Sequence, residues 1–128
     1  MGETNSILIV EDNEINKIVL NKILNRLGYT NVQTAADGKE AIEKVDANSF
    51  DLILMDCQMP VMDGFEATLY IRELANEKAK TPIIAVTANV MDEYRKHCAE
   101  VGMNDFIGKP INIEDLKKAI GKWLKQAS

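Results

Sequence analysis

The segment FDLILMDCQMPVMDG, residues 50–64, decides how the rest of the chain is interpreted. Its apolar run, Leu52 to Met55, has the length and character of a strand buried on both faces of a sheet. The run ends at Asp56, a carboxylate that is costly directly after a buried strand unless its charge has a use. Pro60 and the Asp63-Gly64 pair follow, so we expect a sharp turn beyond the acid. Asp56 is therefore the first candidate for a functional group.

Composition and charge limit the classes of protein that fit. The chain has 128 residues, of which 46% are hydrophobic and 27% charged, as expected for one domain, residues 1–128, that can bury a single substantial core. The net charge of −5 argues against a nucleic-acid-binding surface. No apolar run reaches the roughly 18 residues of a membrane span, and no signal-peptide pattern opens the chain. We expect a cytoplasmic protein without direct membrane contact.

The cysteines and the single histidine carry weak signals. Cys57 and Cys98 lack metal-type spacing, so we expect two reduced thiols that pack as small apolar residues rather than a disulfide. His97 lies among charged residues of a predicted helix and is expected on its polar face, without a phosphotransfer role. The lysines near the C-terminus could form a basic membrane-binding helix, but a solvated face is the expectation.

Short apolar runs alternate five times with amphipathic helical patterns. Strands are predicted at 6–10, 32–36, 52–55, 83–86 and 105–107, and helices at 13–27, from 38, from 64, at about 90–101 and from 113. Apolar side chains at helical spacing predict the inner faces of four helices: Leu20, Ile23, Leu24 and Leu27; Ala41, Ile42 and Val45; Ala67, Ile71 and Leu74; and Ile113, Leu116, Ile120, Trp123 and Leu124. Gly28 and Gly102 are expected to end helices, and Asp63 and Asn112 to cap them. This alternation predicts an α/β fold, a parallel sheet with helices on both faces.

Polar residues stand at the ends of four of the five predicted strands: Glu11-Asp12, Asp56, Thr87 and, after Gly108, Lys109. Because the carboxyl ends of parallel strands lie along one edge of the sheet, we expect these side chains to meet there. Clustered carboxylates suit magnesium, and a hydroxyl with an ammonium suits a phosphoryl group. A central carboxylate beside a metal and a lysine is a plausible nucleophile that forms an aspartyl-phosphate.

With these motifs the chain resembles the receiver domains of two-component phosphorelays over essentially all of residues 5 to 126. Four motifs in this order carry the resemblance: Glu11-Asp12-Asn13, Met55-Asp56 with Met59-Pro60 and Met62-Asp63-Gly64, Val86-Thr87-Ala88, and Gly108-Lys109-Pro110. The amino-acid sequences around these motifs are most similar to those of receiver domains from hybrid sensor histidine kinases. The resemblance implies a flavodoxin-like (βα)5 three-layer sandwich with strand order 2-1-3-4-5.

The resemblance also implies a role for each acid. Asp56 would be the phosphoacceptor and a metal ligand. Asp12 would bind Mg²⁺ directly and Glu11 through water, and the backbone carbonyl of Gln58 would complete the protein ligands. Mn²⁺ could replace Mg²⁺.

Other positions would hold the phosphoryl group or respond to it. Thr87 and Lys109 would contact phosphoryl oxygens, and a cis bond before Pro110 would direct Lys109. Phe106 falls at the switch aromatic position but has no hydroxyl, so any switching there rests on packing. The side chains of Gln58 and Asn89, each two residues after a site residue, are expected to tune the rate of self-dephosphorylation.

The resemblance predicts a phosphoacceptor switch that receives its phosphoryl group from a histidine kinase or a histidine phosphotransfer domain docked on the first helix. Such a domain is not an enzyme in isolation; if it comes from a hybrid protein, the parent would be a histidine kinase. A monomer or a phosphorylation-dependent dimer is expected, with output through protein contacts near the fourth and last helices and the fifth strand.

Other interpretations compete with this one. Asp56 alone could be a capping acid, and Glu11 a solvated neighbour of Asp12. A magnesium-dependent aspartyl-phosphate phosphohydrolase would place a second Asp where Gln58 stands. A nucleotide or flavin binder lacks its glycine motif. A pseudo-receiver scaffold would not need the acidic and phosphate-binding residues, which are all present.

Overall fold

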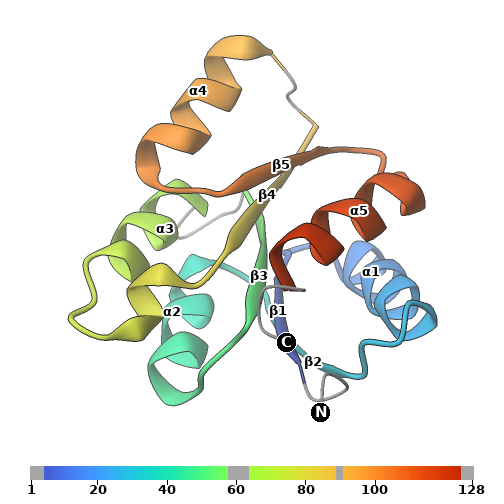
Figure 1. Ribbon diagram of the computed structural model, residues 1–128, viewed down its shortest axis with the longest axis horizontal. Coiled ribbons are helices and arrows are strands. Elements are labelled where there is room, and N and C mark those ends of the chain that lie inside the picture. Colours follow the sequence, from blue (N-terminus) through green and yellow to red (C-terminus); the bar gives the residue numbers. More distant parts are fainter. Residues whose placement is uncertain (1–4, 58–63, 89–90, 125–128) are drawn as a thin grey trace.

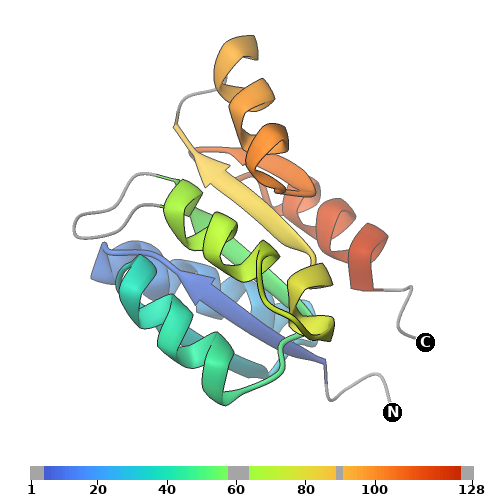
Figure 2. The ribbon, with the colours of Figure 1, turned by 90° about the vertical axis from the view of Figure 1, so that its left-hand side faces the viewer.

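The computed structural model describes residues 5–57, 64–88 and 91–124, and these residues form three layers (Figures 1 and 2). A parallel sheet of five strands in the order β2-β1-β3-β4-β5 is the middle layer: β1 (Ser6–Val10), β2 (Asn31–Ala35), β3 (Leu52–Asp56), β4 (Ile83–Thr87) and β5 (Asp105–Gly108). The helices are α1 (Glu14–Arg26), α2 (Gly38–Ala47), α3 (Gly64–Arg72), α4 (Asp92–Val101) and α5 (Ile113–Leu124), with a 3₁₀ turn, η2 (Glu77–Lys80). The predicted strand order and fold class are confirmed.

Two apolar cores, rather than the single core that the length predicts, explain the layers, because the sheet separates the helices on its two faces. One joins the sheet to α2, α3 and α4, and the other joins it to α1 and α5. Figure 1 shows these two groups of helices on opposite faces of the sheet. The central strands β3 and β4 are buried at every position, because helices cover both of their faces. In register, Leu54 of β3 pairs with Ile9 of β1 and Ile84 of β4. The sheet edge strand β2 is only partly buried, as its weaker apolar pattern predicts.

Local signals in the sequence account for the helix ends. The side chains of Asn13, Asp37 and Asn112 accept hydrogen bonds from backbone N–H groups in the first turns of α1, α2 and α5. Gly28 and Gly102, with φ of 100° and 108°, follow α1 and α4 in the left-handed conformation that glycine adopts without steric cost. The predicted cap Asp63 lies outside the described residues.

The sequence prediction differs from the structure at a few positions. Ile113 is 47% exposed, so the prediction that it lies on the buried face of α5 was wrong. Leu74 is only partly buried, because α3 ends before it, at Arg72. Ile23, Leu27, Ile42 and Trp123 are also partly buried, while the other predicted inward residues are buried. The turn η2 was not predicted.

Within the described residues, no helix is long enough and apolar enough to cross a membrane.

Candidate functional site

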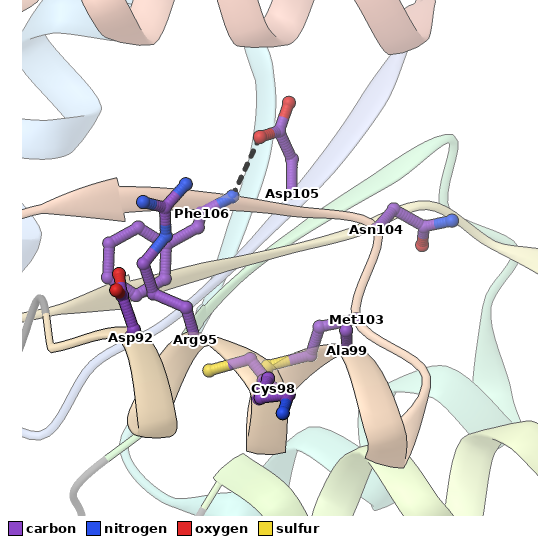
Figure 3. A pocket seen from close by; sticks show the side chains of 9 residues that line it. Asp92, Arg95, Cys98, Ala99, Met103, Asn104, Asp105 and Phe106 are labelled. Carbon is purple, nitrogen blue, oxygen red and sulfur yellow. Dashed lines mark hydrogen bonds between the residues drawn. The ribbon is translucent and has the colours of Figure 1, made fainter.

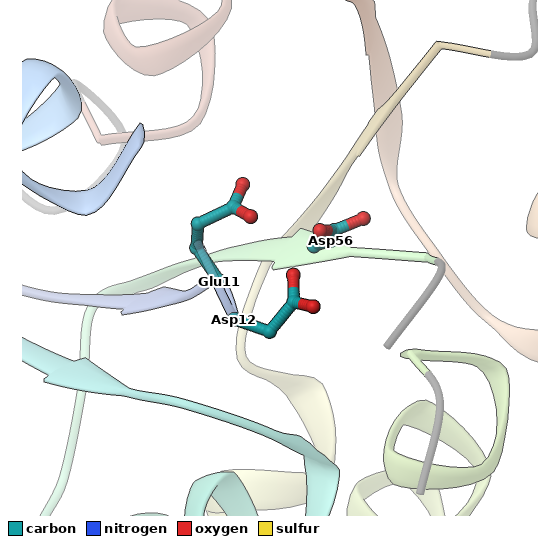
Figure 4. Close-up of side chains that lie close together, drawn as sticks. All are labelled: Glu11, Asp12 and Asp56. Atoms are coloured by element: carbon teal, nitrogen blue, oxygen red, sulfur yellow. The ribbon is translucent and has the colours of Figure 1, made fainter. Parts of the chain in front are cut away.

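Three carboxylates gather where β1 and β3 end (Figure 4). Asp56 is the last residue of β3, and Glu11 and Asp12 directly follow β1. Because β1 and β3 are parallel neighbours, with Val10 opposite Met55, their ends lie side by side. One oxygen from each of the three carboxylates lies within 4.8 Å of the others. The sequence predicts that side chains at the strand ends meet at one edge of the sheet, and these three acids do so.

The three acids differ sharply in exposure. Glu11 is 2% exposed and Asp56 is 4% exposed, whereas Asp12 faces solvent. Glu11 Oε1 accepts a hydrogen bond from Lys109 Nζ, and its Oε2 accepts one from the backbone N–H of Asn13. Glu11 is thus a buried and bonded group, and its alternative reading as a solvated neighbour of Asp12 was wrong.

Lys109 connects two of the acids. Its Nζ lies 3.1 Å from Glu11 Oε1 and 3.3 Å from Asp56 Oδ2. The backbone N–H of Lys109 donates to the Thr87 carbonyl, and the Lys109–Pro110 peptide is cis, as predicted. Burial alone would lower the pKa of Lys109, but the negative charges of Asp56 and Glu11 and their hydrogen bonds outweigh it, so the pKa is raised. The ammonium group is therefore held in its charged form between two carboxylates.

The net negative charge at this edge of the sheet favours the binding of a cation. Three carboxylates face one ammonium, so two negative charges remain uncompensated among these four side chains. Their donor atoms are hard oxygens, which magnesium prefers, and the exposed Asp12 opens the cluster toward water, which magnesium retains in its coordination shell. The donor chemistry and the net charge thus fit a divalent cation.

Thr87 ends β4 beside β3 and is buried, so the predicted hydroxyl also lies at this edge. Sequence reasoning missed Tyr94 of α4, whose hydroxyl interacts with Thr87 and with Cys57. Burial raises the pKa of Tyr94 to about 12, and the hydrogen bond with Thr87 opposes the rise. A helix residue thereby reaches the end of β4.

Phe106 lies on β5 and is partly buried against the core under α4. The guanidinium carbon of Arg95 stands 5.1 Å from the centre of its ring, in a cation–π arrangement. Both residues line a groove of ≈ 500 Å³ between α4 and β5, which Figure 3 shows from close by. Gln58 and Asn89 lie outside the described residues, so their expected influence on dephosphorylation stays a prediction.

The cysteines and the histidine make contacts that the sequence does not reveal. Cys57 and Cys98 are free and buried, as predicted, yet their sulfur atoms lie 3.9 Å apart. Burial raises the pKa of both thiols. His97 is exposed, as expected, but its ring centre lies 4.3 Å from that of Phe65 on α3.

The chain belongs to the response regulator receiver domain family, whose sequence profile matches residues 7–121. Hybrid signal transduction histidine kinase B of Dictyostelium discoideum is 45% identical over 120 residues, which cover 86% of this chain and 6% of that protein. The chain therefore spans only a small part of that relative's length.

Two solved structures extend the comparison. The receiver domain of sensor histidine kinase PA1611 from Pseudomonas aeruginosa PAO1, which holds a magnesium ion in its active site cleft, is 40% identical with a TM-score of 0.86; the match covers 94% of this chain and 98% of that one. The receiver domain of Ssk1 from Saccharomyces cerevisiae, crystallised with the histidine phosphotransfer signaling protein Ypd1, is 30% identical with a TM-score of 0.86 and coverage of 96% and 90%. The resemblance to receivers of hybrid histidine kinases is confirmed.

Proposed function

We propose that this receiver domain is a magnesium-dependent phosphoacceptor switch in which Asp56 takes a phosphoryl group from a phosphohistidine. The observation that carries the proposal is the position of Asp56, whose carboxylate lies at the sheet edge 3.3 Å from Lys109 Nζ and within 4.8 Å of the Glu11 and Asp12 carboxylates. A buried acid with an ammonium group and a cation site beside it is arranged for reaction with an anion rather than for helix capping.

The transfer is a displacement at phosphorus. An oxygen of the Asp56 carboxylate attacks the phosphorus atom, an O–P bond forms, and the P–N bond to the donor imidazole breaks with its electron pair moving to nitrogen. A carboxylate nucleophile needs no general base. Lys109 Nζ, which already contacts Asp56, and the hydroxyl of Thr87 supply donors for the phosphoryl oxygens.

The cation would be held by the carboxylates of Asp12 and Asp56, by Glu11 through water, and by the backbone carbonyl of Gln58, which lies outside the described residues. When bound, Mg²⁺ supplies positive charge to the oxygens of the transferring group, and Mn²⁺ offers the same preference for oxygen. Glu11 suits an indirect role, because both of its oxygens already accept hydrogen bonds within the protein.

The surface of α1 supports docking of a histidine-bearing partner. Ile15, Ile18 and Val19 are 71%, 53% and 47% exposed on this helix, which begins two residues after Asp12. Such a cluster of exposed apolar side chains is typical of a protein contact site. Its place next to the acidic cluster would let a docked partner present a phosphohistidine to Asp56.

Intact mass spectrometry after incubation with Mg²⁺ and acetyl phosphate tests the core of the proposal. The wild type should gain the mass of one phosphoryl group. Asp56→Asn and an EDTA-treated wild type should gain none, while the matched control Asp115→Asn, an exposed acid of α5, should behave as the wild type. Absence of the adduct with every small donor would favour a pseudo-receiver.

The docking step has its own test. Ile18→Asp should slow phosphoryl transfer from phosphorylated Ypd1, used as a histidine donor, at least tenfold, and leave labelling by acetyl phosphate unchanged. Leu69→Asp is the matched control, because Leu69 is 46% exposed on α3, which packs on the opposite face of the sheet. Equal slowing in both variants, or none in Ile18→Asp, would contradict the role of α1.

A further inference from the structure

The two cysteines of the chain form a buried pair beside the proposed phosphoacceptor. Their Sγ atoms lie 3.9 Å apart although 41 positions separate them in sequence, and their exposed fractions are 1% and 2%. The chain has two cysteines in all, so neither has another intramolecular thiol with which to react. A pair at this distance is close enough for a bond to form after a small approach of the two residues.

The pair lies between the end of β3 and α4, two parts of the molecule that are otherwise held together by non-covalent contacts, including the hydrogen bonds of the Tyr94 hydroxyl with Thr87 and Cys57. Cys57 directly follows Asp56 and is anchored by backbone hydrogen bonds, from its own N–H to the Val86 carbonyl and from the N–H of Gly64 to its carbonyl. Cys98 belongs to α4 and lines the groove between α4 and β5 (Figure 3). A covalent bond between them would tie α4 to the end of β3.

The contacts of α4 with its neighbours are non-covalent, and its ring contacts permit adjustment. The rings of Tyr94 and His97 contact Phe65 of α3 edge-on, and Arg95 lies over the ring of Phe106 on β5. Ring contacts of this kind tolerate sliding more readily than the backbone hydrogen bonds that hold Cys57. We therefore expect α4 to make the movement of nearly 2 Å that brings the sulfur atoms to bonding distance.

We propose that Cys57 and Cys98 are a reversible modification site, where a small peroxide forms a disulfide that fastens α4 to the strand end carrying Asp56. One thiol loses its proton and its sulfur attacks a peroxide oxygen; the O–O bond breaks, the departing hydroxide takes up that proton, and a sulfenic acid and water result. The second sulfur then attacks the sulfenic sulfur, an S–S bond forms, and water leaves with the proton of the second thiol. Two thiols are thus oxidised, and one hydrogen peroxide is reduced to two waters.

Burial determines which oxidants can react. Both thiols are nearly inaccessible, so bulky thiol reagents should react slowly with the folded chain, whereas hydrogen peroxide is little larger than water. The groove beside Cys98 gives a small oxidant a short route to α4. The proximity of the second thiol favours the disulfide over further oxidation of the sulfenic acid, because the condensing partner is already in contact.

Mass spectrometry of the full chain treated with hydrogen peroxide tests the proposal. The non-reduced monomer should lose two hydrogens at its cysteines, a proteolytic digest should join the peptides of Cys57 and Cys98, and dithiothreitol should reverse both changes. Peptide mapping is needed because the six methionines can gain oxygen under the same conditions. Cys57→Ala and Cys98→Ala are controls that cannot form the bond. Two oxygens added to either cysteine, disulfide-linked dimers, or unchanged cysteines would overturn the proposal.

A second measurement tests the attachment of α4 itself. The oxidised chain should melt about 10 °C higher than the reduced chain, because the bond closes a long loop, and the amides of α4 should exchange more slowly with deuterium. A bond without slower exchange in α4 would refute the tether. These assays contain no phosphoryl donor, so their failure would leave the proposed phosphoacceptor function unaffected, and failure of that function would leave them interpretable.

Discussion

Replacing Gly64 by alanine should disturb the junction between α3 and the strand that ends at Asp56. Gly64 begins α3, and its backbone N–H donates to the carbonyl of Cys57, the residue after β3. A β-carbon there would stand 2.9 Å from Met55 Cγ and 3.0 Å from Cys57 Cα, and closer still to the backbone carbonyl oxygen of Asp56. Two of these three neighbours are backbone atoms, which cannot rotate away as a side chain can. The start of α3 would have to move.

The expected cost follows from two opposing effects. Overpacking of a well-filled site costs about 1–3 kcal/mol, and more when backbone has to move. Alanine in place of glycine in a helix returns up to about 1 kcal/mol, less in the first turn. The net loss in the free energy of unfolding should therefore be about 1–2 kcal/mol, which lowers the melting temperature by about 5 °C for a domain of this size. The same movement shifts the backbone around Asp56, so labelling by acetyl phosphate should also slow.

Gly121→Ala is the matched control. This glycine lies inside α5, and among the described residues a β-carbon there would have no atom within 4 Å apart from its chain neighbours and the backbone of its own helix. The substitution should stabilise the chain by about 0.5–1 kcal/mol through helix propensity and leave phosphorylation unchanged. Urea unfolding followed by circular dichroism measures both variants. A Gly64→Ala chain as stable as the wild type would refute the close-packing argument, and an equal gain at both positions would show that propensity alone decides.

Three further predictions test other parts of the structure. Mg²⁺ at ten times its Kd should raise the free energy of unfolding of the wild type by about 1.4 kcal/mol, measured in thermal melts. Asp12→Asn should abolish most of this gain. If the gain persists in Asp12→Asn, the cation binds at a site that does not include Asp12. Arg72→Met should cost about 2–4 kcal/mol in urea unfolding, because the guanidinium donates to the carbonyls of Gly102, Ala79 and Thr81 and to Asn104 Oδ1; Arg95→Met is the exposed comparison. Because burial raises the pKa of Tyr94 to about 12, the unfolded chain releases that proton first as the pH rises from 10. The free energy of unfolding should therefore fall between pH 10 and 12, and it should fall less steeply in Tyr94→Phe than in the wild type. Identical pH dependence in the two chains would contradict burial of Tyr94 as the cause.

The strands and their ends could be predicted because their signals are local. An apolar run such as Leu52–Met55 identifies a strand covered on both faces, and its end is marked by the first polar residue. Ile113 was assigned wrongly because helical spacing gives the direction of a side chain but not how far the neighbouring strand extends beneath it. The turn η2 is short and polar, EKAK, and presents no periodicity from which it could be recognised.

The meeting of Asp56, Thr87 and Lys109 could also be predicted, since parallel strands bring their carboxyl ends to one edge whatever lies between them in sequence. Contacts between a helix and that edge follow no such rule. The reach of Tyr94 to Thr87, and of Cys98 to its partner, depends on how α4 is rotated and how closely it packs. Those quantities come from the whole core rather than from any local pattern.

The adjacent acids show most clearly what the structure adds. Glu11 continues the hydrogen bonding of β1, its backbone N–H donating to the carbonyl of Ala35, and its side chain turns inward to Lys109. The next residue, Asp12, turns to solvent. Glu11 therefore compensates the half-buried Lys109 ammonium from the interior side, while Asp12 retains exposed oxygens. Since a hydrated cation keeps several of its waters, it can approach only from the open side. The side of Asp12, where α1 begins, is thus where cation and phosphoryl donor would both have to arrive.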